Sequence, residues 1–171
     1  MTSPLSALLP ALLLTTLGVA CAPTDTTIET VFDPCVPLRI DASQLSDSQA
    51  RSVGNAVTMW NRKAGALLSL ATGADDAADV PLIPVVFQKA AAAFHGLYDD
   101  EAGVVYINDG IDDDHPRSVT VAHELGHAFG LLHVNKDDDK SVMNDGNLQT
   151  EPNDFDVDTL ASIWGRCPAP L

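Results

Sequence analysis

The residues with the clearest chemical potential lie in HELGHAFGLLH, residues 123–133, which holds three of the five histidines of this chain. His123 and His127 are four residues apart, so on a helix both imidazoles project from one face about a turn apart. This spacing suits two ligands of one cation, and zinc readily accepts imidazole nitrogen. Gly130 allows the backbone to turn sharply after the helix, which would bring His133 back as a third ligand.

Glu124 follows the first of these histidines, and we expect it to act as a general base rather than as a metal ligand. It would take a proton from a water molecule in the open fourth position of the zinc ion. The pattern H-E-x-x-H-x-x-G-x-x-H arises by chance in a chain of this composition on the order of once in 10⁵. The other two histidines, His95 and His115, have no ligand spacing and are expected to be core or surface residues.

This extended motif resembles that of the metzincin clan of zinc endopeptidases, in which a Met-turn follows the third histidine. Met143 in SVMN lies ten residues after His133 and is expected to be the Met-turn residue, although alone it would be an ordinary core methionine. Within the clan, GLLH followed by SVM is most similar to the matrixins. The resemblance is specific over residues 123–144 and loose over residues 36–165.

The resemblance implies an α+β (α/β-like) fold, with a mixed twisted sheet, an active-site helix, an upstream helix and a C-terminal helix. It implies a protein or peptide substrate that adds as a strand to an exposed sheet edge, here residues 94–98.

The resemblance also implies structural calcium (Ca2+) beside the catalytic zinc (Zn2+), for which the acidic runs at 99–101, 112–114 and 137–139 are candidates. Solvated loops are the preferred interpretation of these runs, because none of them has EF-hand spacing. We expect the chain to be a monomer.

Several positions depart from the family pattern. Residue 134 is Val where matrixins usually have Ser, and Asp145 stands where astacin-like enzymes have Tyr, so no extra side-chain stabiliser of an oxyanion is expected there. Residues 89–110 lack the insert with additional histidines that binds a second zinc in vertebrate matrixins. Their propeptide with its zinc-blocking cysteine is also absent, and Cys35 is the alternative for that role.

The elements that must position these residues follow in the order strand, helix, strands, helix, helix, which favours a layer with a mixed sheet. A capping box at Ser46–Gln49 opens the first helix, Gly65 ends it, and Pro116 and Gly130 bound the second helix. The small-residue stretch before the second strand is expected to be a loop. Predicted strands are 36–40, 81–88, 94–98 and 103–108, the last helix is 153–165, and the inward side chains include Trp60, Phe155, Leu160, Ile163 and Trp164.

The composition limits the classes of partner. A net charge of −15 with 46% apolar residues suits one globular domain with a substantial core. Nucleic acid is excluded as an expected partner, because the chain has too few clustered cations to release counterions from phosphates.

The N-terminal residues predict export. Residues 1–20 are apolar, carry no charged side chain and end in small residues before Cys21, as signal peptides do. LGVAC resembles a bacterial lipobox, which implies lipidation of Cys21 and a lipid anchor at the cell envelope as the sole membrane contact. The alternative is cleavage without a lipid and an extracellular protein. Residues 21–34 are expected to form a tether, and residues 35–171 the catalytic domain.

The number of cysteines supports this compartment. In a compartment where disulfides form, three cysteines would leave one thiol unpaired. Lipidation of Cys21 would leave two cysteines that can pair. Cys35 and Cys167 lie near the two ends of the predicted domain, where a disulfide would close a long loop and stabilise the fold by about 4 kcal/mol. A free buried pair is the alternative.

Two functions therefore compete. The first is a zinc-dependent endopeptidase that hydrolyses peptide bonds in proteins with Glu124 as general base. The second is a non-catalytic surface lipoprotein that uses zinc structurally or binds partners. A structural zinc site needs no adjacent carboxylate and usually fills all four positions with protein ligands, so Glu124 favours the enzyme.

Overall fold

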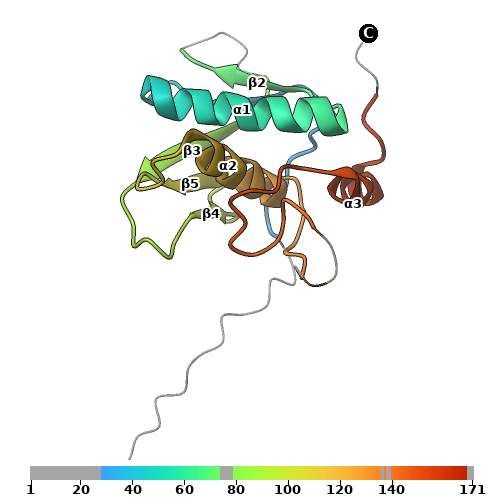
Figure 1. Ribbon diagram of the computed structural model, residues 1–171. Helices are drawn as coiled ribbons and strands as arrows, with labels where there is room; N and C mark the ends of the chain where they lie inside the picture. Colours follow the sequence, from blue (N-terminus) through green and yellow to red (C-terminus); the bar gives the residue numbers. More distant parts are fainter. Residues whose placement is uncertain (1–27, 74–78, 136, 138–139, 169–171) are drawn as a thin grey trace, which may run out of the picture.

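The computed structural model describes residues 28–73, 79–135, 137 and 140–168 (Figure 1). The predicted signal peptide, residues 1–20, and the predicted lipidation site, Cys21, lie outside these residues. None of the described helices combines the length and the apolar character that a bilayer-spanning segment needs.

A five-stranded mixed sheet forms the centre of the fold, with strand order β2-β1-β3-β5-β4. Adjacent strands are parallel except for β4, which pairs antiparallel with β5 and is one edge of the sheet. Ile40, Ile83 and Ile107 are fully buried on neighbouring strands and anchor the sheet in the core. The predicted mixed sheet is confirmed. The strands are β1 (Leu38–Asp41), β2 (Leu68–Ala71), β3 (Leu82–Gln88), β4 (Gly96–Asp99) and β5 (Val104–Asn108).

The expected loop between the first helix and β3 is wrong for residues 68–71, which form β2. This strand pairs in parallel with β1, and its two ends, Leu68 and Ala71, are buried. The amide side chain of Asn61 hydrogen-bonds both the N–H and the C=O of Leu68, at 3.0 and 2.8 Å. A strand of four residues is specified here by partners elsewhere in the chain rather than by its own pattern.

Three helices complete the fold, as predicted: α1 (Asp47–Ala64), α2 (Asp114–Ala128) and α3 (Asp154–Trp164). The capping box at Ser46–Gln49 is present, and Gly65 ends α1 in the left-handed conformation, with φ 69°. α2 begins at Asp114, two residues before Pro116, so the acidic run at 112–114 is partly helical. The buried guanidinium of Arg117 pairs with Asp114 and stabilises this first turn.

α1 and α2 lie side by side over one face of the sheet (Figure 1). Trp60 of α1 is fully buried between them, which confirms its predicted place in the core. Its indole Nε1 donates to the carbonyl of Ala122 in α2 at 2.9 Å, and its ring meets that of Phe129 edge-on, with centroids 5.5 Å apart. This packing fixes the position of α2 relative to the sheet.

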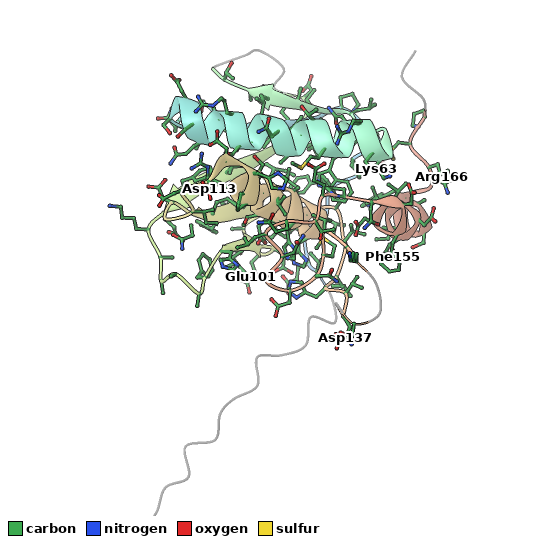
Figure 2. The ribbon with its side chains drawn as sticks, viewed as in Figure 1. Lys63, Glu101, Asp113, Asp137, Phe155 and Arg166 are labelled. Atoms are coloured by element: carbon green, nitrogen blue, oxygen red, sulfur yellow. A yellow bond between two sulfur atoms is a disulfide. The ribbon has the colours of Figure 1, made fainter. Side chains whose placement is uncertain are left out.

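α3 lies apart from the sheet, beside the C-terminal end of α2 (Figure 1). Its inward residues are Asp156 and Leu160, which are four residues apart, while the indole of Trp164 donates to the carbonyl of Phe129 at 2.8 Å. The prediction that Phe155 and Ile163 point inward is wrong: they are 37% and 45% exposed, and Phe155 projects from the helix (Figure 2). A buried carboxylate, which apolar periodicity does not reveal, defines this face of the helix.

The two ends of the domain are joined. A disulfide connects Cys35 to Cys167, as predicted. Residues 28–34, part of the segment predicted to be a tether, also contact the domain: the Tyr98 hydroxyl donates to the carbonyl of Thr30 at 2.9 Å, and the Phe32 N–H donates to the carbonyl of Ala128 at 2.8 Å. The described part of this segment, residues 28–34, therefore lies against β4 and α2.

Candidate metal centre

The three histidines of the motif converge. The Nε2 atom of His133 lies 3.1 Å from the Nε2 atoms of both His123 and His127. A tetrahedral zinc ion with bonds of about 2.0–2.1 Å requires ligand nitrogens about 3.3 Å apart. The donor set could therefore bind one metal ion, and it is the one such cluster of histidine, cysteine and acidic residues among the described residues.

Backbone carbonyls fix the orientation of two of these rings. The Nδ1 atom of His123 lies 2.7 Å from the carbonyl oxygen of Val142, and that of His127 lies 2.8 Å from the carbonyl oxygen of Leu131. A carbonyl oxygen can only accept, so each Nδ1 carries the proton and each Nε2 presents a lone pair to the centre.

Burial keeps these two rings uncharged. It lowers the pKa of His123 to about 4, and a backbone hydrogen bond and the charge of Asp145 offset only part of this shift. Burial likewise lowers the pKa of His127 to about 3, and the neighbouring histidines add to the shift. Both side chains are less than 10% exposed. Neutral imidazole is the form that binds a metal, so the site is ready for a cation at neutral pH.

A turn brings His133, which is exposed, back to the other two histidines. Gly130 follows α2 with φ 93°, as the sequence predicts, and the Leu131 N–H returns to the carbonyl of Gly126 at 2.9 Å. The next residue after His133, Val134, donates its N–H to the carbonyl of Met143 at 3.0 Å and forms a parallel bridge with Asn144. This pairing holds the third histidine against the loop that contains Met143.

Met143 is buried and packs directly against α2. Its Sδ atom occupies the space that a side chain on Gly126 would need, and the Trp60 ring closes the same space at 3.4 Å. Packing against Met143 thus explains why this position of the motif is a glycine. The glycine lets the Met143 side chain lie against the helix at the residue before His127.

Asp156 of α3 secures the same loop from the other side, a role that sequence reasoning missed. Its carboxylate is 1% exposed and accepts from the Ser141 hydroxyl, from the Val142 N–H at 3.1 Å and from the Asn153 N–H at 2.9 Å. The carbonyl of Val142 is the acceptor for His123. A chain of hydrogen bonds therefore links α3 to the first histidine. The only sequence signal is the capping box formed by Asn153 and Asp156.

Glu124 lies in the same pocket as the histidines and is 5% exposed. Burial raises its pKa to about 8, and a hydrogen bond from the Tyr98 N–H in β4 opposes this shift. Gly96 in the same strand makes room for it, because a Cβ there would lie 2.6 Å from the Glu124 Oε1 atom. The carboxyl group is therefore held between α2 and the edge strand.

These groups line a cavity of about 430 Å³. One wall is β4 with the residues before it, another is the loop 145–147, and Ile28 contributes from the N-terminal segment. His95 lines this pocket without joining the ligand set, whereas His115 is exposed at the start of α2. Of the acids considered for calcium, Asp99 and Asp100 accept backbone N–H groups, and Asp138 and Asp139 lie outside the described residues.

No protein family model matches this sequence, and no curated protein matches it either. Among solved structures, the chain is similar to one described as the structure of myroilysin, at 19% sequence identity and a TM-score of 0.47. The match covers 63% of this chain and 54% of that one, so the chain spans about half the length of that structure. The assignment of the site therefore depends on its geometry and not on these comparisons.

Proposed function

We propose that this protein is a zinc-dependent endopeptidase of the metzincin type. The observation that carries the proposal is the convergence of His123, His127 and His133 in one cavity with Glu124. Three imidazole nitrogen donors leave a fourth position open, which is the donor set of catalytic rather than structural zinc sites. The sequence resemblance to matrixins and the Met143 loop support the same assignment.

When bound, zinc would supply Lewis acidity toward water and a peptide carbonyl, and a positive charge that favours the carboxylate form of Glu124. Glu124 then accepts a proton from the attacking water and delivers it to the nitrogen of the leaving amine. The hydrogen bond from the Tyr98 N–H favours the carboxylate form of Glu124. Val142 and Leu131 keep two imidazoles in the metal-binding tautomer through their carbonyl groups.

The substrate backbone would bind along β4. This strand is an edge of the sheet and lines the same pocket as Glu124, and the side chain of Leu97 on it is 50% exposed. An extended peptide that pairs with this edge would pass directly over the histidines and the carboxylate. The predicted edge, residues 94–98, includes the whole of the strand except Asp99.

The closing experiment combines zinc analysis with hydrolysis of casein and of a peptide library. The wild-type protein and Glu124→Gln should both hold equimolar zinc, while hydrolysis should fall by about 10²–10⁴-fold in the variant. Glu101→Gln is the matched control, because Glu101 is an exposed acid in the β4–β5 turn (Figure 2). Equal hydrolysis by Glu124→Gln would contradict the proposal, and bound zinc without hydrolysis by the wild type would support the non-catalytic alternative.

The proposal extends to the location of the protein. The disulfide between Cys35 and Cys167 suits an oxidising compartment outside the cytosol. Export by residues 1–20, with a lipid on Cys21 or without one, would place the enzyme at the cell envelope or in the medium. Mass spectrometry of the mature N-terminus distinguishes the two.

A further inference from the structure

Besides the edge strand, one wall of the pocket is the loop that follows Met143. Asp145, Gly146 and Asn147 of this loop line the cavity together with the histidines and β4. Whatever side chains flank the scissile bond of a bound peptide must lie between this loop and the strand. The chemistry of this loop therefore determines which substrate side chains are accepted.

The loop is held rigidly on both sides of Asp145. Asn144, which is buried, accepts from the Ser141 N–H at 2.9 Å and donates to the carbonyl of Val134 at 3.0 Å. Asn147 donates to the carbonyls of Val142 and Thr150, at 3.1 and 2.7 Å. The carboxylate of Asp145 is thus presented from a fixed backbone, so little ordering is needed when a ligand binds.

The Asp145 carboxylate is available to a ligand. It is exposed, and no group in the described part of the chain makes a hydrogen bond or ion pair with it. Its charge nonetheless reaches the metal centre, because it acts on the His123 ring. A carboxylate so close to the reacting centre, and without a cation of its own, leaves a charge that a substrate can neutralise.

The side chains in the rest of the pocket wall do not neutralise this charge. Among the described residues that line the pocket, none is Lys or Arg, and Asp100 adds a second acid. Asp100 already accepts the Glu29 N–H at 2.7 Å, which leaves Asp145 as the acid without a partner. A concave wall of one sign focuses the field and raises the local concentration of groups of opposite charge.

We propose that Asp145 is a specificity residue, which selects peptides with a Lys or Arg side chain beside the scissile bond. This inference rests on the proposed peptidase function and adds the class of substrate to it. Peptides with Asp or Glu at the same position would bring two carboxylates together and would be cleaved more slowly than neutral ones.

The test uses peptides built around one bond that the wild-type enzyme cleaves in casein. Each flanking position is in turn Lys, Gln or Glu, and the ratio of kcat/KM for Lys over Gln is measured. The wild type should prefer Lys by about fivefold at one position or more, the upper range for an ion pair in contact with solvent. At about 1 M salt, where the Debye length is about 3 Å, this ratio should fall toward one.

Two variants and a control assign the preference to one residue. Asp145→Asn should bring the Lys over Gln ratio close to one, and Asp145→Lys should favour Glu. Asp113→Asn removes the same charge from the N-terminal end of α2, about 15 Å along the helix from His123, and should leave the ratio unchanged (Figure 2). Asn is as good an N-cap as Asp, so this control should fold normally.

The ratio is measured within each preparation, so a loss of zinc or of folded protein cancels. Cleavage of the Gln peptides without any preference for Lys would overturn the inference and leave the peptidase function intact. A preference for Lys that survives in Asp145→Asn would also overturn it. Failure to cleave any peptide would contradict the proposed function itself.

Discussion

The Met143 side chain fills the volume that a methyl group on Gly126 would occupy. A glycine in the middle of a helix costs about 1 kcal/mol relative to alanine, so the position gives up helix stability for this contact. The contact is made at the residue before His127, and it connects α2 to the loop whose residues 145–147 line the pocket.

Gly126→Ala should therefore destabilise the protein although alanine favours helix. We expect a net loss of about 1–2 kcal/mol, because overpacking outweighs the gain in helix propensity. Thermal unfolding with excess zinc measures it. Gly73→Ala, at a site where no atom lies within 4 Å of an added Cβ, is the control. In the background of Met143→Ala the cost of Gly126→Ala should disappear, and a cost that remains would contradict the contact.

Removal of the Asp156 carboxylate should weaken zinc binding without touching a ligand. Asp156→Ala leaves the Val142 N–H and the Ser141 hydroxyl without their acceptor, and the carbonyl that orients His123 belongs to the same peptide segment. Residues that orient metal ligands typically contribute 10–100-fold to affinity. Competition with a zinc chelator measures the effect. Asp158→Ala, which removes an exposed acid from the same helix, should bind zinc as the wild type does.

A side chain at position 96 should impair hydrolysis while zinc binding persists. The Cβ of Gly96→Ala would lie 2.6 Å from the Glu124 Oε1 atom, so the carboxyl group must move away from the edge strand. Loss of position by a general base costs about 10²-fold in rate. Steady-state kinetics together with zinc analysis distinguish this from loss of the metal. An unchanged kcat would show that the Glu124 carboxyl group is not fixed by β4.

The metal-free protein should be most stable near pH 6.5. Between about pH 6.5 and 4.5, the unfolded chain protonates His123 and His127 while the folded chain does not, so folding stability falls as the pH falls. Glu124, whose pKa is raised to about 8, keeps a proton in the folded state above pH 4.5, whereas the unfolded chain has lost it. In the difference in bound protons between the two states, this proton offsets one of the two histidine protons. The net slope is about 1.4 kcal/mol per pH unit in this interval.

The same reasoning gives the opposite slope on the alkaline side. From pH 6.5 to about 8, the folded chain keeps the Glu124 proton that the unfolded chain has lost, so stability falls as the pH rises. Glu124→Gln should therefore flatten the alkaline side and steepen the acid side. Urea unfolding of the chelated proteins across this range measures both slopes. A variant with the profile of the wild type would show that Glu124 does not titrate in this way.

The sequence predicts the local features of this fold well. The spacing of the histidines, the left-handed Gly130 and the capping box at Ser46–Gln49 each depend on neighbouring residues only, and each is present. The buried Trp60 follows from helical periodicity in the same way. Features that depend on neighbouring residues can therefore be predicted without knowledge of the tertiary contacts.

What the sequence does not reveal depends on distant partners. Asp156 can be buried because the hydroxyl and N–H groups of residues 141–142 donate to it, and the capping box at the start of α3 does not predict these distant donors. β2 forms by pairing with β1 and by hydrogen bonds to Asn61. Ile28 lines the pocket, and Asp100 and Tyr98 fix the two residues that follow it by hydrogen bonds. These features of the site depend on tertiary contacts, which local sequence patterns do not predict.

The disulfide between Cys35 and Cys167 has a practical meaning for a protein proposed to cut polypeptides. These two cysteines are 132 positions apart in the chain. A single autolytic cleavage between them would leave the two fragments joined by the disulfide. On a gel without reductant, a nicked molecule would migrate as a single species and pass for intact material. Autolysis of this protein would become visible only after the thiols are released.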